Sequence, residues 1–348
     1  METKYVDVCD SFIDLVIHSN QLKNTNYKYE GHTFTPNEGD LALVKNEEYI
    51  FQNNFWNRAG YIDTEVSQIK LGVFGSCVSD FSVNDLCYKA PQMKLTRKIY
   101  TAFTNIDQPT VDMKFENEFT CDFAERICNY LVNKNEFNDL AADKPDYLVI
   151  DLLRDIFAYY KITKDDFTTY VSDIFSRYDT INNYAFTQGL EKLQEDGYNV
   201  EMVSANTLDV EVRKNSLIHS LNKICEIIPQ ENIIVIQPLM VSKYVKEGSD
   251  KITLREPNED YVMQLNEEYS WLKEVIPDAK YINLPDETIG IAFNWNSEES
   301  WHYVPETYRY IGKCIYDYIY TDGAHIYALT SKYVEILETR YYNKMEIE

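Results

Sequence analysis

A cysteine and a histidine, far apart in the chain, have side chains that can do covalent chemistry. Cys77 lies in the stretch FGSCVSD (74–80), where the apolar run IKLGVF ends. A Gly-Ser-Cys turn between a buried strand and a helix holds a thiol or a hydroxyl beside main-chain N–H groups at the carboxyl end of the strand. His302 follows far downstream in WHYVPETY, in a polar loop before a helical pattern. A nucleophile and a base on one α/β scaffold are the groups that acyl transfer requires.

Two neighbouring residues of the turn are candidates for the nucleophile. A thiol at a helix N-terminus is intrinsically nucleophilic and is activated by the helix dipole, which favours Cys77. Cys77 could instead be a small buried apolar residue that follows a strand. The hydroxyl of Ser76 is the alternative nucleophile, and its structural role would be to cap the helix.

His302 is the candidate general base among the five histidines of the chain. His18 and His219 lie within apolar helical patterns, where a structural role is expected. A base must reach the proton of the nucleophile, so the sulfur and an imidazole nitrogen should lie about 3–4 Å apart in an open cleft. The alternative is an imidazole packed between aromatic neighbours without a chemical role.

Charged residues follow the predicted strand in DYLVIDLLRD, and two of them are candidates for the site. Asp151 and Arg154 stand where this strand ends, at the edge where ligands bind in open α/β sheets. They could contact the substrate or an oxyanion, or they could form a buried ion pair that braces the fold.

Short apolar runs alternate with helical patterns from residue 69 onward. The apolar runs predict strands at Leu71–Phe74, Tyr147–Ile150, Ile233–Ile236 and Tyr281–Leu284. Helical patterns begin near Asp122, Leu208, Glu259 and Pro305. Strands that alternate with helices predict an α/β fold with a doubly wound parallel sheet.

The chain divides into two regions of different character. Residues 1–66 alternate and contain turn signals, which predicts a small β-rich extension of unknown role. Residues 67–348 form the predicted α/β domain. The region 155–205 is too long for a simple crossover and is interpreted as an insertion or lid, and the end of the chain as a helical tail.

Composition excludes several classes of function. The 348 residues carry a formal net charge of −24, which argues against a nucleic-acid partner and against anionic membrane surfaces. The seven cysteines are odd in number and scattered, and no CxxC occurs, which disfavours a zinc cage or a disulfide framework. They are Cys9, Cys77, Cys87, Cys121, Cys128, Cys225 and Cys314. With no signal-peptide pattern and no apolar stretch long enough to span a membrane, we expect a cytoplasmic protein. No metal cluster, phosphate loop or dinucleotide fingerprint is present.

The turn at Cys77 resembles the first block of the SGNH/GDSL hydrolase superfamily, which reads Gly-Asp-Ser-Leu-Ser. Gly75 matches the glycine, Ser76 the aspartate and Cys77 the nucleophilic serine. The turn is more similar to a branch in which this block reads Gly-Ser-Cys, an SGNH-like family of unknown function linked to surface-polysaccharide gene clusters. The pair His302-Tyr303 and the strand DYLVIDLLRD also resemble that branch, so the resemblance covers roughly residues 69–320.

The chain departs from the superfamily pattern at three blocks. The asparagine expected after the second strand is absent, and Arg154 could stabilise an oxyanion in its place. Glu299 replaces the aspartate three residues before the histidine, and a glutamate there can still orient the imidazole. The nearest polar candidates for the second block are Thr104 and Asn105, in YTAFTNID.

The resemblance implies a flavodoxin-like, SGNH-type fold and an acyltransferase or esterase acting on O-acetyl groups of a cell-surface glycan or its precursor. It implies no permanently bound cofactor, with acyl-CoA as a possible donor, and a carbohydrate or acylated small molecule as substrate. The residues that would hold the oxyanion or the substrate are Gly75, Asn105, Asp151, Arg154 and Tyr303. The alternative is a catalytically inactive binding or assembly subunit, with partner proteins in a polysaccharide or cell-wall pathway.

Overall fold

The structure is a computed structural model of the chain and divides into two compact units, Met1–Ser67 and Gln68–Glu348. It describes residues 7–9, 15, 18–19, 34–44, 47–52, 55–61, 68–90, 92–99, 101–106, 108–115, 122–173, 180–246, 251–292 and 301–344.

The first unit contains a four-stranded sheet in the order β1-β2-β3-β4. The strands are β1 (Asp7–Cys9), β2 (Leu41–Val44), β3 (Glu47–Gln52) and β4 (Phe55–Tyr61). Its small core includes Phe51 and Trp56, whose rings meet edge to face at 5.2 Å. The indole of Trp56 donates a hydrogen bond to the hydroxyl of Ser19. Trp56 therefore packs inside its own unit.

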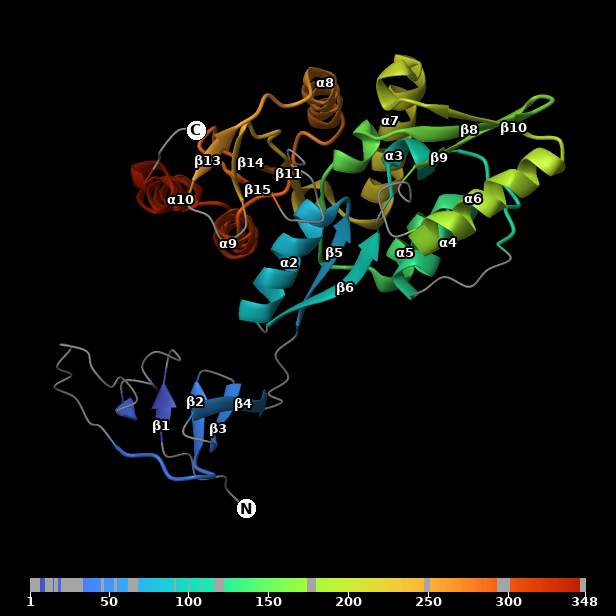
Figure 1. The fold of residues 1–348 in the computed structure, drawn as a ribbon. Coiled ribbons are helices and arrows are strands. Elements are labelled where there is room, and N and C mark those ends of the chain that lie inside the picture. Colours follow the sequence, from blue (N-terminus) through green and yellow to red (C-terminus); the bar gives the residue numbers. More distant parts are fainter. Residues whose placement is uncertain are drawn as a thin grey trace. The chain divides into compact units, whose positions relative to one another are not determined.

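A five-stranded parallel sheet forms the centre of the second unit (Figure 1). Its strands, in chain order, are β5 (Ile69–Phe74), β6 (Met93–Ile99), β7 (Tyr147–Ile150), β11 (Ile233–Gln237) and β14 (Lys280–Asn283). They lie in the order β14-β11-β7-β5-β6. Counted from the β6 edge, this is the 2-1-3-4-5 order of the flavodoxin-like folds. The predicted parallel α/β fold is confirmed.

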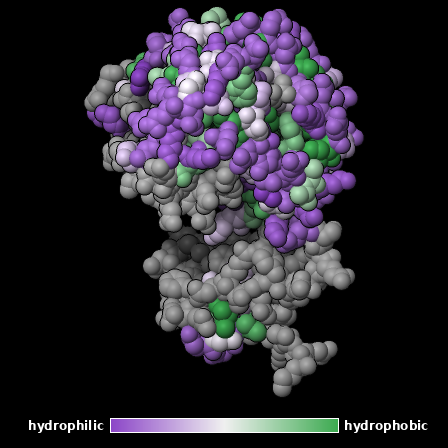
Figure 2. All heavy atoms as spheres, turned by 90° about the vertical axis from the view of Figure 1, so that its right-hand side faces the viewer, coloured by the Kyte–Doolittle hydropathy of each residue, from purple (hydrophilic) through white to green (hydrophobic). Residues whose placement is uncertain are grey.

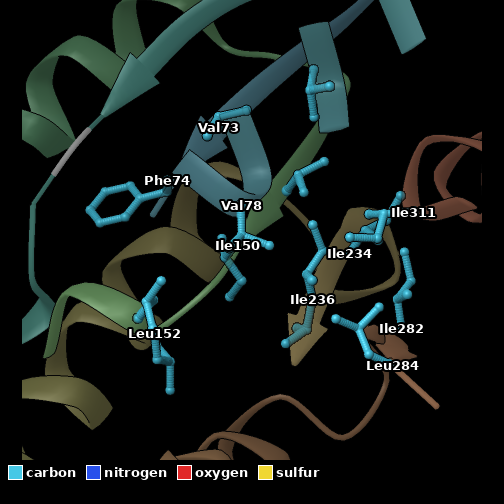
Figure 3. Close-up of a cluster of buried hydrophobic side chains, with 14 of the residues drawn as sticks. Val73, Phe74, Val78, Ile150, Leu152, Ile234, Ile236, Ile282, Leu284 and Ile311 are labelled. Atoms are coloured by element: carbon cyan, nitrogen blue, oxygen red, sulfur yellow. The ribbon is translucent and has the colours of Figure 1, made fainter. Parts of the chain in front are cut away.

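The inner strands of this sheet are buried on both faces, which explains why they read as continuous apolar runs. Figure 3 shows Ile234 and Ile236 of β11 gathered with Ile282 and Leu284 beside them, and with Ile311 from a covering helix. Strand β6 was not predicted. Its sequence MKLTRKI is mostly half-buried because the strand lies at the sheet edge, so its polar residues hide the strand pattern.

Helices flank the sheet in two packed groups. One group contains α2 (Cys77–Lys89), α9 (Pro305–Thr321) and α10 (Ile326–Arg340). The other contains α3 (Phe103–Ile106), α5 (Glu136–Asp143), α7 (Val210–Ile227) and α8 (Glu259–Val275). Helix α9 crosses α2 closely at Gly312, where an added Cβ would lie 3.2 Å from the carbonyl oxygen of Ser82.

The stretch of chain between β7 and β11 forms a second, antiparallel sheet. It contains β8 (Tyr159–Lys164), β9 (Phe167–Ser172) and β10 (Asn199–Val203). Helices α4 (Asp122–Asn133) and α6 (Thr180–Glu195) share an apolar cluster with it. Figure 2 views the molecule from this side, where the second unit is mostly hydrophilic with small, separate hydrophobic patches.

Three further strands form a small sheet in the order β13-β12-β15. They are β12 (Lys243–Lys246), β13 (Ile252–Leu254) and β15 (Gly290–Ala292). Strand β15 matters for the site because the segment that carries His302 pairs with it. In the described ranges, no helix has the length and apolar character needed to cross a membrane.

Candidate active site

The Gly-Ser-Cys turn joins β5 directly to α2. Ser76 is the N-cap of the helix, and its hydroxyl oxygen accepts a hydrogen bond from the N–H of Val78 at 3.1 Å. Gly75 packs against Asp151 so closely that an added Cβ would lie 2.7 Å from the carboxylate oxygen. Only a residue without a side chain fits this approach, and Cys77 consequently stands at the first position of the helix.

Asp151 anchors the turn from the end of β7. Its Oδ2 accepts hydrogen bonds from the N–H and hydroxyl of Ser76, both at 3.0 Å, and from the N–H and hydroxyl of Ser79. Its Oδ1 accepts the N–H of Leu153 at 3.0 Å. The carboxylate is buried, so these donors replace water as its partners. The hydroxyl of Ser76 thus donates to Asp151 and accepts from the helix at the same time.

Cys77 and His302 lie next to each other at the carboxyl edge of the sheet. The sulfur of Cys77 is 3.6 Å from Nε2 of His302. The thiol is half-buried, whereas the imidazole is only 6% exposed. This distance is within hydrogen-bonding range for sulfur, so a proton can pass between the two groups.

Main-chain pairing and aromatic packing hold His302 in place. Its carbonyl oxygen accepts the N–H of Ile291 at 2.8 Å, and the next residue, Tyr303, forms a β-bridge with Gly290. On the other side, the ring of Trp301 packs 5.2 Å from that of Phe157. The histidine is therefore fixed by β15 and by an aromatic contact. Glu299, predicted to orient the imidazole, lies outside the described residues.

The imidazole of His302 is neutral at physiological pH. Burial, followed by the positive charge of Arg154, lowers the pKa of His302 to about 4. A neutral imidazole can accept a proton, as a general base must. The resting pair is consequently a thiol beside a neutral imidazole.

Arg154 supplies the positive charge of the site. It lies in the short 3-10 helix Leu153–Ile156, directly after β7, and is buried with its guanidinium 5.8 Å from the ring of Phe157. Its positive charge lowers the pKa of His302, the histidine beside Cys77. A buried cation here can stabilise negative charge that develops on a reacting group.

Two of the other predicted residues are held by structural hydrogen bonds. Asn105 is fully buried in α3; its amide oxygen accepts the N–H of Ser172, and its nitrogen donates to the hydroxyl of Thr101. Tyr303 is also fully buried, and its hydroxyl donates to the carbonyl and accepts the N–H of Leu239. Asn105 connects α3 to β9, and Tyr303 ties the histidine segment to the loop after β11.

Tyr308 and Phe81 are neighbours of the site that the sequence did not point to. The hydroxyl oxygen of Tyr308 accepts the N–H of Tyr303 at 3.2 Å. Its ring meets that of Phe81 edge to face at 5.5 Å, and Phe81 is one helical turn after Cys77. The sequence gives one weak indication of Tyr308, which is that it belongs to the same WHYVPETY stretch as His302.

Three further cysteines lie in surroundings that disfavour the thiolate. Burial raises the pKa of Cys87 to about 11 and that of Cys314 to about 12, and it raises the pKa of Cys225. These thiols remain protonated at neutral pH. Over the residues whose positions are described, no three His, Cys, Asp or Glu side chains gather where they could hold a metal ion.

Comparison with solved structures gives a distant similarity in structure. The chain is similar to an acetyl xylan esterase, Est2A, from the rumen bacterium Butyrivibrio proteoclasticus, with 11% sequence identity and a TM-score of 0.33. The match covers 78% of this chain and 67% of the esterase. No protein-family model matches the chain, and no curated protein matches it significantly.

Proposed function

We propose that this protein is an acyl esterase or acyltransferase that works through a thioester on Cys77. The observation that supports this proposal is the 3.6 Å contact between the sulfur of Cys77 and Nε2 of His302. A nucleophile within reach of a neutral base is the arrangement that covalent acyl transfer needs. The positive charge of Arg154 acts on His302, and a buried cation near the reacting pair can stabilise an oxyanion.

The first half-reaction forms the acyl-enzyme. The sulfur of Cys77 bonds to the ester carbonyl carbon while its proton passes to Nε2 of His302, and the carbonyl π electrons move onto oxygen. The N–H of Cys77 at the helix N-terminus and the guanidinium of Arg154 stabilise this oxyanion. When the carbonyl re-forms, the bond to the leaving oxygen breaks, and His302 gives its proton to that oxygen.

The second half-reaction releases the acyl group. Water or an acceptor hydroxyl attacks the thioester carbon through its oxygen. At the same time, the neutral imidazole of His302 takes the proton from that oxygen. The carbon–sulfur bond then breaks, and His302 returns the proton to the sulfur of Cys77. Water as the acceptor gives an esterase, and a carbohydrate hydroxyl gives a transferase.

The substrate class that we propose is an O-acetylated carbohydrate, such as a cell-surface glycan or its precursor. The resemblance of the Gly-Ser-Cys turn to the polysaccharide-linked SGNH-like branch supports this choice. Phe81 also supports it, because its side chain is 45% exposed one helical turn after Cys77. An exposed aromatic ring can stack on the apolar face of a sugar ring. In the transferase reaction, acyl-CoA would be the donor.

Acylation of Cys77 by a simple ester tests the proposed chemistry. Incubation with 4-nitrophenyl acetate should release a burst of nitrophenolate and leave one acetyl group on Cys77, located by mass spectrometry. The half-buried thiols of Cys87 and Cys225 provide an internal control, because their raised pKa values should keep them unreactive. The variant Cys77→Ala should give no burst.

Failure of this experiment would favour the alternative function. If Cys77 is acetylated no faster than Cys87 or Cys225, the site does not activate its thiol. The protein would then be better described as a binding or assembly subunit that keeps the fold without its chemistry.

A further inference from the structure

Tyr308 contacts both segments that carry the reacting residues of the site. Its hydroxyl oxygen accepts the N–H of Tyr303, which directly follows His302. Its ring contacts Phe81, which lies one turn after Cys77 on α2. The phenol is thus connected to the histidine segment at one end and to the nucleophile's helix at the other.

The phenol proton of Tyr308 has a defined chemical state but no structural use. Burial, and next the charge that Cys77 would carry as a thiolate, raise the pKa of Tyr308 well above its usual value, so the hydroxyl stays protonated. Within the described part of the chain, the hydroxyl accepts one hydrogen bond and donates none. An accepted N–H occupies one lone pair and leaves the O–H free to rotate toward another acceptor.

We propose that Tyr308 is a catalytic residue whose O–H donates a hydrogen bond to the oxyanion formed when Cys77 attacks an ester. This inference rests on the proposed acyl transfer and adds a donor to its oxyanion site. The N–H of Tyr303 holds the phenol oxygen in place before the reaction begins, and only the O–H has to turn toward the oxyanion. Preorganised donors of this kind act most strongly where water is excluded.

Tyr308 provides what Asn105 does not. Asn105 is one of the residues expected from the sequence to help hold the oxyanion. The amide of Asn105 is engaged by Ser172 and Thr101 instead. The phenol of Tyr308 comes from α9, far along the chain, and stands beside the Cys77–His302 pair.

In the reaction, Tyr308 donates a hydrogen bond and transfers no proton. As the sulfur of Cys77 bonds to the carbonyl carbon, the π electron pair moves to oxygen, and the thiol proton goes to His302. The O–H of Tyr308 binds the resulting oxyanion. When the leaving oxygen departs with the proton from His302, the carbonyl re-forms and the hydrogen bond weakens again.

The variant Tyr308→Phe tests this role because it removes one oxygen and keeps the ring that contacts Phe81. Two reactions of Cys77 are compared in the full-length protein. Acetylation by 4-nitrophenyl acetate passes through an oxyanion, whereas alkylation by iodoacetamide displaces iodide without one. We expect the acetylation rate to fall about 10²-fold, with KM for the ester little changed, and the alkylation rate to stay as in the wild type.

A matched control makes the same substitution elsewhere on α9. Tyr318→Phe removes a phenol hydroxyl that donates to the carbonyl oxygen of Tyr281, away from Cys77 and His302, so acetylation should remain close to the wild-type rate. If Tyr308→Phe is acetylated as fast as the wild type, the proposal is wrong. A parallel fall of acetylation and alkylation also overturns it, because the hydroxyl would then maintain the Cys77–His302 pair. If the wild type is not acetylated at Cys77 at all, the acyl-transfer function itself fails.

Discussion

The sulfur of Cys77 lies 3.6 Å from Nε2 of His302, although the two residues are 225 positions apart in the sequence. Each is placed by a different part of the fold. The turn after β5 fixes Cys77 through its bonds to Asp151, and pairing with β15 fixes the histidine. Because Cys77 and His302 are held by different segments, a substitution that disturbs one of these residues should leave the position of the other unchanged.

Asp151→Asn should destabilise the protein strongly. The buried carboxylate accepts five hydrogen bonds, and an amide presents N–H groups to some of these donors. We expect a loss of about 3 kcal/mol in the free energy of unfolding, measured by urea denaturation. Asp146→Asn is the control, because the exposed carboxylate of Asp146 accepts a single N–H, that of Lys70, near the start of β5. Its loss should stay below about 1 kcal/mol, and equal losses would show that Asp151 is not the anchor.

The two candidate nucleophiles should respond differently to substitution. Ser76→Ala removes a helix cap and should cost about 1 kcal/mol of stability while leaving the thiol of Cys77 reactive. Cys77→Ser keeps the shape of the site but replaces the thiol by a poorer nucleophile, so ester turnover should nearly cease. Steady-state hydrolysis of 4-nitrophenyl acetate measures both. The reverse ranking would make Ser76 the nucleophile.

His302 should make the protein sensitive to acid. Its pKa is about 4 in the folded state, below the ordinary value of about 6.5, so the unfolded chain binds a proton first as the pH falls. The free energy of unfolding should therefore decrease between about pH 6.5 and 4, by up to about 3 kcal/mol. Above this window His302 is neutral in both states and contributes no pH dependence.

The variant His302→Gln isolates this effect because glutamine does not titrate. Urea denaturation at neutral and at acid pH should show a smaller loss of stability for His302→Gln than for the wild type. His219→Gln, on α7, leaves the site intact and should keep the wild-type loss. If both variants lose stability with acid equally, burial of His302 is not the cause.

The positive charge of Arg154 should account for part of the lowered pKa of His302. In Arg154→Gln the positive charge is lost, protonation of the imidazole becomes easier, and the pKa of His302 should rise. In Arg154→Lys the charge is kept, and the pKa should stay low. NMR titration of the imidazole protons measures both. A pKa that rises equally in the two variants would assign the effect to solvent entry rather than to charge.

Local patterns predicted most of the central fold. Four of the five central strands and the helices α4, α7, α8 and α9 follow apolar runs and helical patterns in the sequence. These patterns arise because an element buried on both faces, or along one stripe, must be apolar there. Strand β6 escaped prediction because an edge strand is only partly buried, so its composition carries little of that constraint.

The sequence also singled out Cys77 and His302 by residue type and local motif. What only the tertiary structure decided is which partner each polar group has. Asp151 holds the turn, Asn105 is engaged by Ser172, and Tyr308 stands beside the histidine segment. A hydrogen bond depends on positions within a few tenths of an ångström, set by chain segments far apart in sequence. Residue types restrict what each group can donate or accept, and the packing of the whole sheet decides with which atom it does so.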